Sequence, residues 1–162
     1  MSNYYHPCKL ETLLINQTKM QIFIIGTPFE TAKDLDPRRL NKQIIETKQI
    51  IDAILGVGKG WFNHPIVKMY KNNPQFLMMY LVCLESYRDG DYIKALQFSD
   101  GAMMQKPDFI DEYLITQMKR RLYTKDNNHY SQWKDLGQSN VNFYYVDGNW
   151  LYYENGKLIK NP

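Results

Sequence analysis

The stretch from residue 35 to residue 60, "LDPRRLNKQIIETKQIIDAILGVGKG", constrains the fold more than any other part of this sequence. Asp36 is a natural N-cap residue, and Pro37 suits the first position of a helix because its missing N–H has no partner there. The glycine-rich run that begins at Gly56 ends the helical pattern. We therefore predict a long amphipathic helix over residues 37–55.

The two faces of this helix have opposite character. At about 100° per residue, one side collects an apolar set and the other a polar set. The apolar set is Leu40, Ile44, Thr47, Ile51, Ile54 and Leu55, and the polar set is Arg38, Arg39, Lys42, Gln43 and Glu46. By pattern alone, the common explanation is a solvated face with an ordinary Lys42–Glu46 pair. The alternative is a site in which cations keep one carboxylate ionised, as a base or as the stabiliser of a cationic intermediate.

Further helices follow along the chain. Pro65 and Pro74 each suit a helix start, and the second of these helices should end near Gly90. Residues 92–98 fit one more short helix. Asp108 is a candidate cap for a helix across "FIDEYLITQMKRRLY", whose apolar residues recur every four positions and so face a core. This stripe consists of Ile110, Leu114, Met118 and Leu122.

The two ends of the chain carry strand patterns. Residues 10–25 contain two β-prone runs around "NQTK", which favour a strand pair. Residues 141–160 alternate aromatic and β-branched residues around Asp147-Gly148 and Asn155-Gly156, which predict a β-meander. The fold class is mainly α (α+β), a compact helical core with these strands added. We predict a single domain over 1–162, made of an extension (1–19), a core (20–135) and a hairpin tail (141–160).

Composition limits the classes of function. The net charge is only +3, from 20 basic and 17 acidic residues, so affinity for nucleic acid requires local clusters of cations. No apolar run reaches the length of a membrane span, so no membrane partner is expected. The two cysteines, Cys8 and Cys83, are isolated, which suits a reducing cytoplasm. The three histidines show no metal-ligand spacing, and "GVGKGW" lacks the spacing of a phosphate-binding loop. No metal and no cofactor are predicted.

Three ordered motifs between Met20 and Trp133 resemble the pyrimidine-dimer DNA glycosylase family, the phage and bacterial relatives of endonuclease V. They are "LDPRRLNKQIIE", then "GWFNHPIVKMY", and later "LYTKDNNHYSQW". The resemblance implies a mainly helical protein that binds duplex DNA at a damaged or abasic site and flips a nucleotide out of the helix. An amine then attacks the sugar C1′, an imine forms, and β-elimination cuts the strand. It also implies a cytoplasmic protein, in the host cytoplasm if a phage encodes it.

The resemblance also suggests residue roles. Glu46 matches the family carboxylate, with Arg39, Lys42 and Gln43 beside it in the same motif. His64 matches the histidine that begins the next helix, and Lys125 and Tyr130 match the last motif. Two sets of cations are expected to contact the DNA backbone. They are Arg38 with Arg39 and Lys42 on the first helix, and Lys119, Arg120 and Arg121 with Lys125 further on.

The sequence departs from the family at two positions. The family nucleophile is an α-amino group exposed by removal of the initiator Met, and "MQIFIIG" resembles that start, which points to Gln21. Residues 1–19 precede Met20, however, so Lys42 or the amine of Ser2 is a candidate substitute. At Met118 relatives often carry a histidine. The alternative function is therefore a catalytically retired relative that binds or sequesters a nucleotide or nucleic acid, for example a phage anti-defence protein.

Overall fold

The computed structural model describes residues 21–57, 60, 62–139, 141–146, 149–155 and 157–160. Its elements, in chain order, are six α-helices, one 3₁₀ helix and three strands. They are α2 (Pro28–Asp34), α3 (Pro37–Leu55), α4 (Pro65–Tyr70), α5 (Pro74–Arg88), α6 (Tyr92–Met104), α7 (Glu112–Lys125), η1 (Ser131–Leu136), β1 (Val141–Val146), β2 (Asn149–Glu154) and β3 (Lys157–Lys160). Within these ranges, every helix is too short or too polar to cross a lipid bilayer. The prediction of a mainly α fold with a small C-terminal sheet is confirmed.

Helix α3 begins and ends where the sequence predicts. The Asp36 Oδ1 accepts a hydrogen bond from the Arg39 N–H at 3.0 Å, which satisfies one of the free donors of the first turn. At the other end Gly56 adopts a left-handed conformation with φ 71°, which a residue with a side chain rarely takes. The boundaries of α4 and α5 are also confirmed, since each opens at its proline.

Two helix boundaries differ from the prediction. Helix α6 continues to Met104 rather than ending near residue 98, because Ala95, Ser99 and Ala102 give it a buried face. Helix α7 is capped by Asp111 and not by Asp108, since the Asp111 Oδ1 accepts from the Leu114 N–H at 2.9 Å. The chain around Asp108 is held in a turn by the bond from the Ile110 N–H to the Pro107 carbonyl.

The helix α2 was not predicted, although its sequence carries a capping box. The Thr27 hydroxyl accepts from the Glu30 N–H at 3.1 Å, and the Glu30 carboxylate accepts from the Thr27 N–H at 3.4 Å. Pro28 occupies the first helical position. The 3₁₀ helix η1 was not predicted either, and it packs against α7 with Trp133 buried.

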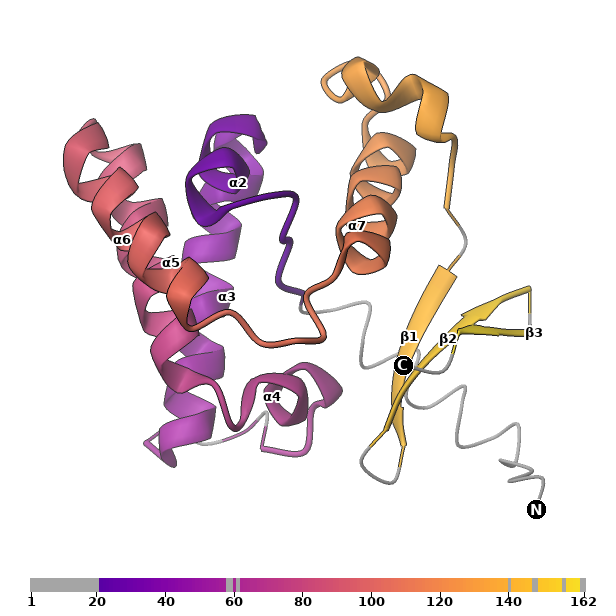
Figure 1. Ribbon diagram of the computed structural model, residues 1–162, viewed down its shortest axis with the longest axis horizontal. Coiled ribbons are helices and arrows are strands. Elements are labelled where there is room, and N and C mark those ends of the chain that lie inside the picture. The colour runs from indigo at the N-terminus through magenta and orange to yellow at the C-terminus, as the bar shows by residue number, and fades with distance from the viewer. Residues whose placement is uncertain are drawn as a thin grey trace.

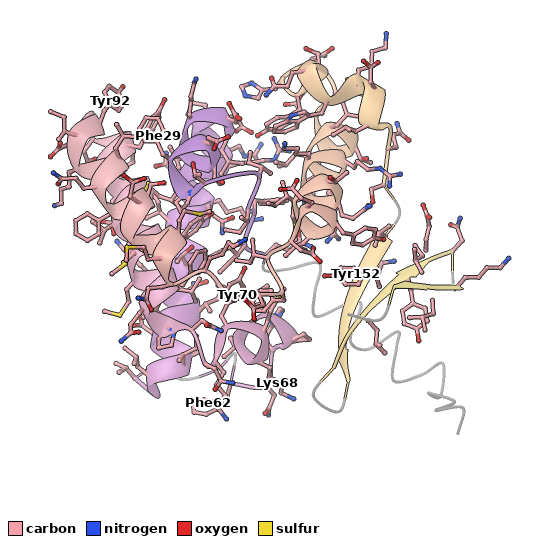
Figure 2. The ribbon with its side chains drawn as sticks, in the orientation of Figure 1. Phe29, Phe62, Lys68, Tyr70, Tyr92 and Tyr152 are labelled. Carbon is pink, nitrogen blue, oxygen red and sulfur yellow. The ribbon has the colours of Figure 1, made fainter. Side chains whose placement is uncertain are left out.

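The C-terminal β-meander is confirmed as an antiparallel sheet in the order β1-β2-β3. Val141 pairs with Glu154 and Val146 with Asn149. Figure 2 labels Tyr152 on β2. Its ring meets that of Tyr113 on α7 edge-on, with 5.1 Å between the centroids. The predicted N-terminal strand pair is not found in residues 21–25, which lie in no strand. The other half of that predicted pair falls outside the described residues.

Residues 21–25 instead form a segment that lies between α3 and α7 (Figure 1). The Tyr80 hydroxyl of α5 donates to the Phe23 carbonyl at 2.8 Å, and the Phe23 N–H donates to the Gln43 Oε1 of α3 at 2.6 Å. Side-chain groups thus replace the neighbouring strand that an extended chain normally needs. Four consecutive side chains of the segment are buried in the core, namely Ile22, Phe23, Ile24 and Ile25.

Candidate functional site

A charged cleft lies where residues 21–23, the first half of α3 and the end of α7 meet. Its volume is about 430 Å³. The lining residues are Gln21, Phe23, Asp36, Arg38, Arg39, Lys42, Gln43, Glu46, Lys125 and Asp126. The structure therefore brings together the polar face of the first helix, Gln21 and two residues of the last predicted motif, Lys125 and Asp126. We call this the α3–α7 cleft.

Two members of the polar face of α3 are buried, which contradicts the simple picture of a solvated face. Gln43 is 1% exposed and Glu46 is 9% exposed. The Gln43 side chain spans the gap to the segment of residues 21–25. Its Oε1 accepts from the Phe23 N–H at 2.6 Å, and its Nε2 donates to the Gln21 carbonyl at 2.8 Å. Conversely, Leu55, which the helical pattern places on the apolar side, is 57% exposed at the end of the helix.

Glu46 is a buried carboxylate that lines the α3–α7 cleft. Its Oε2 accepts from the backbone nitrogen of Gln21 at 3.3 Å, and its Oε1 lies 3.6 Å from the Lys42 Nζ. Burial raises the pKa of Glu46, and the hydrogen bond from Gln21 with the charges of Lys42 and Lys125 offsets part of that rise. A carboxylate with a raised pKa accepts a proton more readily than an ordinary carboxylate does.

The cations around Glu46 differ in their surroundings. Arg38 and Lys42 are exposed, whereas Arg39 is held by an ion pair of 2.8 Å with Asp36 and lies 3.8 Å from Asp126. Burial lowers the pKa of Arg121 to about 10, which leaves the guanidinium charged at neutral pH. In the amide orientation that satisfies both groups, the side-chain oxygen of Gln21 accepts from Arg121 at 2.7 and 3.0 Å.

Tyr130 lies behind the cleft and holds the start of α3. Its ring is fully buried and stacks on Trp133 with 5.3 Å between centroids. Its hydroxyl donates to the Asp36 Oδ2 at 2.6 Å and accepts from the Asp36 N–H at 3.1 Å. Burial raises the pKa of Tyr130 to about 12. Tyr130 therefore positions Asp36, and through Asp36 it positions Arg39.

Asp36 gives a pH-dependent contribution to stability. Burial opposes its ionisation, but hydrogen bonds from Tyr130 and Arg39 prevail and lower its pKa to about 2. A group with a lowered pKa stabilises the fold fully above its unfolded pKa of about 4, and the contribution is lost as the pH falls towards 2. We expect Asp36→Asn to lower the free energy of unfolding by about 1 to 2 kcal/mol at pH 7, after allowance for solvent screening.

Urea unfolding of wild type and Asp36→Asn between pH 2 and pH 7 measures this contribution. The difference between the two proteins should shrink as the pH falls from 4 to 2. Asp52→Asn, at an exposed position of the same helix, is the matched control and should shift stability little. A difference that stays constant across this pH range would show that Asp36 does not carry the effect.

Several other predicted site residues lie away from the cleft. His64 is buried and caps α4, since its Nδ1 accepts from the Ile66 N–H at 3.1 Å. Lys119 lies over the Trp133 ring at 5.9 Å. Arg120 donates to Gln117 and to the Gln138 carbonyl, and so ties the chain before β1 to α7. Met118 is 5% exposed and belongs to the core, as its place on the apolar stripe predicts.

Phe23 and Asp126 line the cleft, and sequence reasoning missed both. Phe23 lies in an apolar run, and nothing in that run shows which residue faces a polar site. Asp126 follows the last basic residue of α7, where it accepts from the His129 N–H at 3.0 Å. Among the described residues, no group of three or more His, Cys, Asp or Glu side chains could hold a metal ion.

The part of the chain that forms the α3 side of this cleft is similar to a known protein family. Residues 20–86 match the family model described as pyrimidine dimer DNA glycosylase. The match includes Gln21 and all of α3, and it ends within α5 before the wall that α7 supplies. No curated protein and no solved structure matches the chain. Residues 20–86 are therefore similar to the pyrimidine dimer DNA glycosylase family, the family that the sequence motifs resemble.

Proposed function

We propose that this protein is a DNA glycosylase with abasic-site lyase activity, which acts on damaged duplex DNA through an imine in the α3–α7 cleft. One observation carries the proposal. The buried carboxylate of Glu46 accepts a hydrogen bond at 3.3 Å from the nitrogen of residue 21, within a cleft lined by cations. We propose a cytoplasmic site of action, where DNA is present and Cys83 stays reduced.

Glu46 suits the role of the carboxylate in imine chemistry for two reasons. Its negative charge stabilises the positively charged imine at short range in a partly desolvated cleft. Its raised pKa also lets it take a proton from the substrate and give it back. We propose that Glu46 performs both tasks on the deoxyribose ring.

The sequence offers three candidate amines, of which Gln21 and Lys42 are among the described residues and Ser2 lies outside them. A chain that began at Gln21 would carry its α-amino group at the position of the nitrogen that now contacts Glu46. In the sequence given, Met20 precedes Gln21, so that nitrogen belongs to a peptide bond and has no free lone pair for attack. Lys42 is the second candidate. Its side chain is 65% exposed and pairs with Glu46 at 3.6 Å.

The exposed cations at the rim are proposed to hold the DNA backbone. Arg38 and Lys42 lie on adjacent turns of α3 and both line the cleft. The affinity for duplex DNA falls as the salt concentration rises. Each phosphate contact makes the slope of log affinity against log salt concentration steeper by about 0.9. We expect Arg38→Ala and Lys42→Ala each to reduce that slope by about 0.9, measured by fluorescence anisotropy with an abasic duplex.

The control for this measurement is Lys94→Ala, since Lys94 is exposed on α6 and lines no part of the cleft. This variant should keep the slope of the wild type. A wild-type affinity that hardly changes with salt would contradict backbone binding. It would favour the alternative, a relative that binds or sequesters a small nucleotide in a cleft of about 430 Å³.

Borohydride trapping tests the enzymatic proposal directly. A duplex with one abasic site is incubated with the full 162-residue protein, and the imine is reduced to a stable secondary amine. We expect a covalent protein–DNA product together with strand cleavage in the absence of borohydride. A folded protein that gives neither product would overturn the proposal.

A further inference from the structure

We propose that Lys125, at the end of α7, supplies the amine that attacks C1′ in the full chain. The proposal rests on the lyase function proposed above, and it identifies the nucleophile of the same site. Lys125 lies outside the family match, which ends at residue 86. It is also not one of the candidates that the sequence offers for this role.

The geometry places the Lys125 amine in the cleft on the wall opposite α3. Lys125 is a lining residue, and its Nζ lies 5.7 Å from the centre of the Phe23 ring. That ring is held in place, because the Phe23 backbone is bound by Gln43 on one side and by Tyr80 on the other. The amine therefore lies over the face of an aromatic ring at the end of α7, and it interacts electrostatically with Glu46.

The charges around Lys125 favour a neutral amine, which is the form that attacks carbon. Desolvation lowers the pKa of Lys125, although the residue as a whole is exposed to solvent, as Lys42 is. The cations Arg121, Lys42 and Arg39 lower the pKa of Lys125 further, while the charge of Glu46 raises it. A lysine crowded by other cations is a recognised form of activated nucleophile.

Lys42 is less suited to the same role. Its side chain is 65% exposed, and its Nζ forms the ion pair of 3.6 Å with Glu46. That ion pair already engages the Lys42 amine with the Glu46 carboxylate. Lys42 therefore pairs with the Glu46 carboxylate, and its positive charge helps to lower the pKa of Lys125.

The covalent steps at an abasic site balance without any co-reactant except water. The Lys125 Nζ lone pair attacks the C1′ aldehyde carbon, and loss of water leaves a protonated imine. Glu46 removes a proton from C2′, and the electron pair of that C–H bond moves to expel the 3′ phosphate. Hydrolysis of the imine then frees the amine and releases an unsaturated aldehyde on the cut strand.

The test is borohydride trapping of the full chain on an abasic duplex, followed by peptide mapping of the adduct. Three variants are compared with the wild type. Lys125→Arg keeps the positive charge and removes the proposed nucleophile. Lys42→Arg keeps the charge and removes the other candidate amine, on α3. Lys68→Arg is the control. Figure 2 shows Lys68 on α4 at the lower edge of the molecule, and it lines no part of the cleft.

We expect the adduct on Lys125 and a fall in trapping of at least about 100-fold in Lys125→Arg, while Lys68→Arg traps like the wild type. Lys42→Arg should still give an adduct on Lys125. An adduct on any other residue, or full trapping by Lys125→Arg, would overturn the assignment and leave the lyase function standing. A wild-type protein that is folded and gives no adduct would overturn both.

Discussion

Glu46→Gln is expected to slow strand cleavage at an abasic site by about 100- to 10,000-fold, the usual contribution of a group that transfers protons. The amide cannot accept the C2′ proton, and it places no negative charge beside the imine. The fold should persist, because the amide oxygen can still accept from the Gln21 N–H and no buried charge is added. Cleavage of a labelled duplex measures the rate, and anisotropy measures binding.

Glu85→Gln is the matched control for this prediction. Glu85 lies on α5 in an ion pair of 3.8 Å with Lys48, and it lines no part of the α3–α7 cleft. Its replacement should leave the cleavage rate unchanged. If Glu46→Gln cut abasic DNA as fast as the wild type, Glu46 would have no part in the chemistry.

Gln43→Ala is expected to lower the free energy of unfolding by about 2 to 4 kcal/mol, because it removes two hydrogen bonds and leaves the Phe23 N–H without its acceptor. It should also lower the rate of strand cleavage, since Gln43 binds the segment in which the Gln21 N–H contacts Glu46. Urea unfolding measures the first effect. Gln43→Glu should recover only part of the stability, because a carboxylate accepts from Phe23 but cannot donate to the Gln21 carbonyl.

The control for Gln43→Ala is Gln49→Ala, a replacement of the same residue type at an exposed position of the same helix. This change should shift stability by no more than about 0.5 kcal/mol. A similar small loss in Gln43→Ala would show that the Gln43 hydrogen bonds contribute little to holding the segment of residues 21–25.

Much of the helical fold could be predicted because its signals are local. The proline and cap residues before α3, α4 and α5 mark their starts, and Gly56 marks the end of the first. The errors arose where contacts distant in the sequence decide the structure. The segment 21–25 has strand-forming residues, yet side chains from α3 and α5 satisfy its backbone, so it lies in no strand.

The candidate site could be predicted only in part for the same reason. The helical period places Glu46 beside Lys42 and Gln43, and the family resemblance adds Gln21. The period cannot show that Gln43 and Glu46 are buried, because their cover comes from residues 20 or more positions away. It also cannot show that Lys125 and Asp126 form the opposite wall, since helix α7 reaches the cleft only through tertiary packing.

The bond between Tyr130 and Asp36 joins residues 94 positions apart. During synthesis, the residues of α3, including Glu46, therefore leave the ribosome long before Tyr130, which binds the cap residue Asp36. Contacts of such long sequence separation form late, because the closure of a long loop costs entropy first. The carboxylate and its cations should acquire their final arrangement only after the chain has been synthesised beyond Tyr130. A nascent or truncated chain that ends before α7 would have the helix of the site without its chemistry.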